Sequence, residues 1–113
     1  MRKVHAILEP HELEPARRAL ARIDVIGMTI TEVRGMSRHE GHRERYRTAE
    51  YTVDLLPKVI LEVVATEGRA QQVAHQLRQT LHAGGNAAAR VFIEPVEEAF
   101  RIRTGERGPS ALS

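Results

Sequence analysis

The spacing of apolar residues changes several times along this chain, and the order of the changes limits the fold. Between Lys58 and Thr66 apolar residues are nearly continuous, with Val59, Leu61, Val63 and Ala65 on one face. Ile60 and Val64 add apolar surface to the other face. A run of this length that is apolar on both faces is typical of a buried strand. We therefore expect residues 58–66 to form a central strand of a sheet.

A helix is expected directly after this strand. Apolar residues recur there at the 3.6-residue spacing of one helix face, and Gly84-Gly85 ends the pattern. The residues of this face are Ala70, Val73, Ala74, Leu77 and Leu81. The same reasoning predicts a strand over residues 4–8, a helix over 13–23, and further strands over 28–33 and 91–93.

These elements follow one another in the order strand, helix, strand, strand, helix, strand. That order is typical of the α+β class with a ferredoxin-like βαββαβ sandwich, in which two helices cover one face of the sheet. The 113 residues suffice for a single domain, which we place at residues 1–113. The second face of the sheet also needs a cover, so we expect copies of the chain to associate through it.

A polar stretch between the second and third strands, residues 36–54, is the least ordinary part of the sequence. It has 19 residues, and irregular loops beyond about 12 to 15 residues in a compact domain are usually functional. Basic and acidic residues balance within it, which suits docking to proteins better than tracking a phosphate backbone. A long flexible effector loop is one interpretation, and an ordinary solvated loop is the other.

Composition excludes several classes of protein. The chain has no cysteine and a formal net charge of only +2, so a disulfide framework is excluded and nucleic-acid binding is not demanded. No export signal or run of about 18 apolar residues is visible, which predicts a cytoplasmic protein that does not span a membrane. Neither a catalytic grouping nor an RNA-binding strand with stacking aromatics is present, so the enzyme and RNA-binding alternatives are weak.

Three groups of residues carry a resemblance to a known family. They are residues 27–35 (GMTITEVRG), residues 41–58, where GH, YRTAEY and LPK stand at fixed separations, and residues 101–106 (RIRTGE). At these spacings, which need no gap, the chain resembles the nitrogen regulatory PII family. The resemblance spans nearly the whole chain.

The resemblance implies a homotrimer whose clefts between subunits bind ATP or ADP. It implies a regulator, not an enzyme, that controls a membrane transporter or a regulatory enzyme of nitrogen metabolism through residues 36–54. Thr29, Glu62 and Val64 would border the adenine. Arg38, Arg101 and Arg103 would contact the phosphates, and Gly35 and Arg90 complete the nucleotide-binding set. Arg101 and Arg103 flank Ile102, so an extended segment would point both guanidinium groups the same way.

Two further ligands and one modification follow from the same resemblance. Lys58 matches the lysine that holds 2-oxoglutarate, with Gly41 beside it, and a lysine on a central strand needs a carboxylate partner in any case. A structural ion pair is therefore the alternative role of Lys58. Tyr51 matches the tyrosine that is uridylylated in many relatives, although its presence does not prove modification.

The match fails at two places. Within the altered loop at residues 82–90, the family pattern Thr-Gly-x-x-Gly-Asp-Gly-Lys is replaced at residues 83–90 by AGGNAAAR. Fewer glycines restrict close approach of the backbone to phosphates, so ADP or AMP becomes an alternative to ATP. His39 stands where a glutamine ligates Mg²⁺ in the family, and imidazole prefers transition metals. His39 with His42 thus supports an alternative, a trimeric metal-binding or metal-responsive protein.

Overall fold

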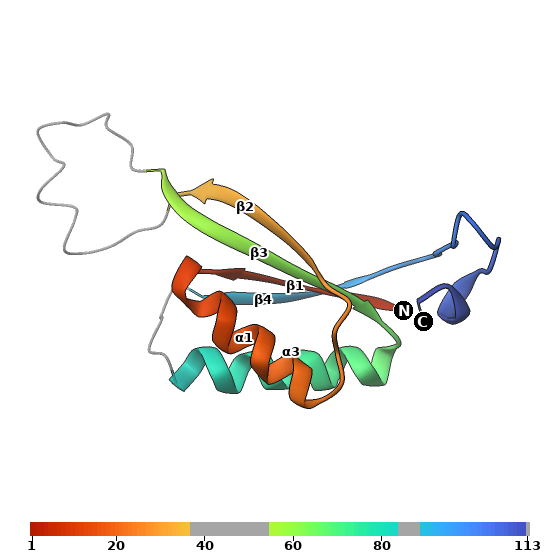
Figure 1. The fold of residues 1–113 in the computed structure, drawn as a ribbon, viewed down its shortest axis with the longest axis horizontal. Coiled ribbons are helices and arrows are strands. Elements are labelled where there is room, and N and C mark those ends of the chain that lie inside the picture. The colour runs from red at the N-terminus through yellow and green to blue at the C-terminus, as the bar shows by residue number, and fades with distance from the viewer. Residues whose placement is uncertain (37–54, 84–88, 113) are drawn as a thin grey trace, which may run out of the picture.

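The computed structural model describes residues 1–36, 55–83 and 89–112 of the chain. Within these residues, four strands, two helices and two short 3₁₀ turns follow one another (Figure 1). Their bounds are β1 Arg2–Leu8, η1 Pro10–Glu12, α1 Leu13–Arg22, β2 Thr29–Gly35, β3 Leu56–Ala65, α3 Glu67–Ala83, β4 Arg90–Pro95 and η2 Gly108–Leu112. This order confirms the predicted α+β ferredoxin-like arrangement.

The four strands form one antiparallel sheet in the order β2-β3-β1-β4. The predicted central strand is confirmed, because β3 pairs with β2 on one side and with β1 on the other. In this register Val4 lies opposite Val63, and Leu8 lies opposite Val59. Alternate residues of neighbouring strands therefore project from the same face of the sheet.

The core lies between one face of the sheet and the two helices (Figure 1). The strands contribute Val4, Ala6, Leu8, Leu61 and Val63, all nearly inaccessible to solvent. From α3 come the five residues that helical spacing predicted, and all of them are buried. Because one periodic stripe carries every buried residue of α3, the rest of that helix faces solvent.

The connection from β1 into α1 contains a reciprocal pair of glutamates. Glu9 and Glu12 form a capping box around η1, in which the Glu9 backbone N–H donates to Glu12 Oε1 at 2.7 Å. Such a pair satisfies backbone donors that a helix start leaves unbonded. It holds the Glu9 side chain next to the end of β1.

The second face of the sheet carries Ile7, Ile60, Val64 and Phe92, and neither helix covers it. Val64 is 38% exposed and Phe92 is 47% exposed. Exposed apolar surface on a strand face favours association with another chain. Assembly through this face, and its trimeric form, remains a prediction. Among the described residues, neither helix is long and apolar enough to cross a membrane.

The C-terminal segment departs from expectation. An extended conformation at Arg101 and Arg103 is wrong, because residues 102–104 form a turn that the Arg101 carbonyl closes by accepting from Gly105 N–H at 2.8 Å. A bridge between Phe100 and Arg107 holds the two sides together. Gly105 has a φ of 78°, a conformation that side chains disfavour. The expectation that both guanidinium groups point the same way, which assumed an extended segment, therefore does not hold.

Candidate functional site

The candidate site begins on the uncovered face of the sheet. Thr29 of β2 lies directly opposite Glu62 of β3, and Glu62 lies opposite His5 of β1. Phe92 of β4 completes the row, with its ring edge-on to His5 at a centroid distance of 6.1 Å. Four strands thus align a hydroxyl, a carboxylate, an imidazole and an aromatic ring across the sheet.

Glu62 is the charged centre of this row. Its Oε2 lies 3.2 Å from Lys3 Nζ and 3.1 Å from His5 Nδ1. The hydrogen bond from Lys3 lowers the pKa of the Glu62 carboxyl below its ordinary value of 4.5; burial opposes this effect and His5 supports it. Glu94 lies farther off, 3.9 Å from His5. Glu62 is therefore an ionised acceptor at neutral pH.

Lys58 lies on the same face of β3, four residues from Glu62 toward the end at which β1 finishes. Its Nζ donates to Glu9 Oε1 at 2.7 Å, and the Lys58 side chain is only 8% exposed. The structure thus supplies the carboxylate partner that a buried lysine requires. Gly35 stands beside this lysine, and a Cβ added there would lie 3.4 Å from Lys58 Cγ. The side chain of Lys58 therefore passes close to the Gly35 backbone.

Arg90 lies at the same end of the sheet as Lys58. It is the first residue of β4 and pairs with Ile7, so its side chain belongs to the uncovered face. Val64, by contrast, pairs with Lys3 near the start of β1. The predicted adenine residues thus lie toward the Met1 end of β1, and Arg90, Lys58 and Gly35 lie toward the Leu8 end.

The segment that follows β4 and contains Arg101 and Arg103 lies beyond the Met1 end of the sheet (Figure 1). Val96 N–H donates to the Met1 carbonyl at 3.1 Å, and the chain then continues into the C-terminal turn. Arg101 is bound within its own segment, with Nε 3.2 Å from Glu106 Oε1 and Nη2 donating to the Ala111 carbonyl at 3.3 Å. Arg103 is exposed. The whole length of β4 separates these arginines from Arg90, about 17 Å at 3.3 Å per residue.

Several predicted residues lie outside the described residues. These are Arg38, His39, Gly41 and Tyr51, together with most of residues 36–54 and the altered loop at 84–88. Within the described ranges, no group of three or more side chains is placed to hold a metal ion. The metal alternative rests on His39 and His42, and so it stays a prediction.

The partners of the site were not identified from the sequence. Lys3 and His5 surround Glu62, and Glu9 neutralises Lys58, but none of the three was singled out. One signal was available for the first two. Val4, Ala6 and Leu8 are apolar, so Lys3 and His5 had to share the opposite face of the first strand. Which residue of the third strand each would meet depends on register, which periodicity does not give.

Comparison with known proteins agrees with this fold. The family model described as nitrogen regulatory protein P-II matches residues 1–106. A nitrogen regulatory protein P-II of Haemophilus influenzae is 45% identical over 112 residues, and one of Azospirillum brasilense is 42% identical over the same length. Each match covers 99% of this chain and 100% of the relative. The chain belongs to the nitrogen regulatory protein P-II family of signal-transduction regulators.

Proposed function

We propose that this P-II protein binds an adenine nucleotide, ATP or ADP, in a cleft shared by two copies within a homotrimer. One observation carries the proposal. On a single chain, Arg101 and Arg103 lie beyond the adenine end of the site, whereas Arg90 lies at the other end of β4. Because they lie so far apart, the three arginines can converge on one polyphosphate only if a second copy supplies Arg101 and Arg103.

The adenine end has the chemistry to recognise an amino-substituted base. Glu62 Oε2 is occupied by Lys3 and His5, and Oε1 makes no hydrogen bond or ion pair with a described residue. A carboxylate oxygen accepts hydrogen bonds only, so Oε1 suits the exocyclic amine of adenine. The hydroxyl of Thr29, which stands across from it, can donate or accept.

Binding of 2-oxoglutarate at Lys58 would have to compete with Glu9. A dicarboxylate that approaches this lysine must share or displace Glu9, whose Oε1 already accepts from Nζ at 2.7 Å. A lysine ammonium has three donors, so sharing is feasible when the second carboxylate enters from the uncovered face. We further propose that ligand binding here changes how residues 36–54 engage a membrane transporter or regulatory enzyme in the cytoplasm.

Titration calorimetry tests the ligand. The purified protein is titrated with ATP, ADP and AMP, each with Mg²⁺ and with or without 2-oxoglutarate, and the series is repeated for Arg103→Ala. Binding of ATP that 2-oxoglutarate strengthens would support a nitrogen sensor, and binding of ADP or AMP alone would support a sensor of another signal. Absence of heat with all three nucleotides would contradict the proposal.

Mixed assemblies test whether two copies share each site. Arg90→Ala and Arg103→Ala chains are expected to bind weakly alone, because each loses one half of every cleft. When the two are unfolded together and refolded as an equal mixture, about a quarter of the interfaces should combine two intact halves. Recovery of that fraction of binding sites would support a shared cleft. Mixtures that bind no better than the separate variants would contradict it, provided that light scattering shows the same trimer.

A further inference from the structure

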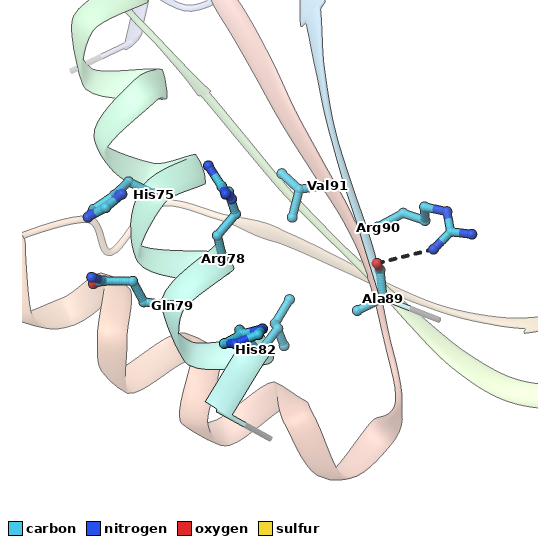
Figure 2. A pocket seen from close by; sticks show the side chains of 8 residues that line it. His75, Arg78, Gln79, His82, Ala89, Arg90 and Val91 are labelled. Carbon is cyan, nitrogen blue, oxygen red and sulfur yellow. Dashed lines mark hydrogen bonds between the residues drawn. The ribbon is translucent and has the colours of Figure 1, made fainter. Parts of the chain in front are cut away.

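A cleft on the helix-covered side of the molecule shares one described lining residue, Arg90, with the proposed nucleotide site. It lies between the second half of α3 and the start of β4 and has a volume of about 600 Å³. Figure 2 shows Arg78 on α3 and Val91 on β4, with His82 one turn farther along the helix. A space of this size is in the range of small-molecule sites.

The walls of the cleft combine apolar surface with positive charge. Leu81 is buried, and Ala89 and Val91 pack against the core from the β4 side. Arg78 and His82 are four residues apart on α3, so their side chains are neighbours on one helix face. Apolar walls with a few convergent polar groups are the usual composition of a ligand site.

Three basic side chains of α3 at this cleft, His75, Arg78 and His82, have no ion pair with a described carboxylate, whereas several other basic residues do. Arg2 pairs with Glu67 at 2.8 Å, and Arg17 pairs with Glu14 at 2.6 Å. No described residue places a carboxylate within ion-pair distance of Arg78 or His82, nor of His75 one turn before Arg78. Among the described residues, no carboxylate therefore neutralises the Arg78 guanidinium, which lies beside apolar surface.

This cleft and the proposed nucleotide site lie on opposite sides of β4. Consecutive strand residues project from opposite faces, and Figure 2 shows the Arg90 guanidinium on the far side of the strand from Arg78. Arg90 Nη1 lies 3.5 Å from the Ala89 carbonyl. Arg90 therefore borders the cleft but directs its guanidinium to the uncovered sheet face, whereas the Val91 side chain faces the cleft.

We propose that the cleft binds a small organic anion, a molecule with one phosphate or carboxylate group and an apolar body. Arg78 would hold the anionic group through its planar fork, which matches the oxygen spacing of both groups. His82 would donate a further hydrogen bond, with His75 at the rim. The apolar body would lie against Leu81, Ala89 and Val91.

Methyl-resolved NMR tests this site directly. The intact protein is titrated at one pH with phenyl phosphate and with benzoate, while the methyl signals of Val91 and Ala89 are followed. Benzyl alcohol serves as the neutral control for the apolar body. We expect saturable shifts with at least one anion, none with the alcohol, and an affinity about 10- to 100-fold weaker in Arg78→Gln, from the loss of a charged hydrogen-bond donor. The stronger of the two anions identifies phosphate or carboxylate as the preferred group.

Two variants separate this site from general charge effects and from the nucleotide site. Arg18→Gln removes one exposed positive charge from α1 and should leave the affinity unchanged. Arg103→Ala impairs the proposed nucleotide cleft and should also leave it unchanged, so the two proposals fail independently. The inference would be overturned by unsaturable shifts with both anions, by full affinity in Arg78→Gln, or by equal losses in Arg18→Gln or Arg103→Ala.

Discussion

Glu9 and Lys58, 49 residues apart in sequence, form an ion pair of 2.7 Å on the uncovered face of the sheet. The capping box at η1 fixes the position of Glu9, and the central strand β3 fixes that of Lys58. A side chain proposed to hold a ligand is thus neutralised by the chain itself. A change in this ion pair should therefore affect both the stability of the fold and the proposed binding of the ligand.

Glu9→Gln should destabilise the protein by about 3 kcal/mol, because it leaves the Lys58 ammonium without a counter-charge where little solvent reaches it. The free energy of unfolding in urea measures this effect. The double variant Glu9→Gln with Lys58→Met should recover much of the loss, since it removes the uncompensated charge. A single variant within about 0.5 kcal/mol of the parent would show that the pair contributes little.

Gly35 should tolerate alanine but not a large side chain. A Cβ at this position would reach only van der Waals contact with Lys58 Cγ, at 3.4 Å. We expect Gly35→Ala to change the free energy of unfolding by less than about 1 kcal/mol, and Gly35→Leu to cost about 1 to 3 kcal/mol through overpacking. Equal stabilities of the two variants would show that the Lys58 side chain moves aside freely.

Leu77→Ala should cost about 2 to 5 kcal/mol in unfolding free energy, because Leu77 is completely buried between α3 and the sheet. The control is Gln71→Ala on the exposed side of the same helix, which should stay within about 0.5 kcal/mol of the parent. Thermal unfolding by circular dichroism compares the two. A small loss at Leu77 would mean that the core closes over the missing volume.

Periodicity predicted the parts of this fold that depend on one face of one element. All five residues expected on the buried face of the second helix are buried, and the strand at 58–66 is central. Contacts that depend on strand register, such as Glu62 with Lys3, could not be predicted because a shift by one residue changes every partner. Only the extended conformation assumed at Arg101 and Arg103 was wrong, because Gly105, with its positive φ, turns the chain there. An isolated glycine does not reveal which turn it forms.

Lys3→Met should raise the pKa of Glu62, because the hydrogen bond from Lys3 is the largest cause of its low value. A carboxyl whose pKa is lower in the folded state stabilises the fold above its unfolded pKa, near 4.5, and this stabilisation is lost as the pH falls through the folded pKa. The variant should therefore lose stability at pH 7 relative to the parent and show a smaller further loss on acidification below pH 4.5. Carbon-detected NMR titration of the Glu62 carboxyl, with urea unfolding at each pH, measures both effects.

Arg2→Met is the matched control, since Arg2 lowers the pKa of Glu67 instead. An unchanged Glu62 pKa in Lys3→Met, or an equal rise in Arg2→Met, would show that Lys3 does not set the charge of the site.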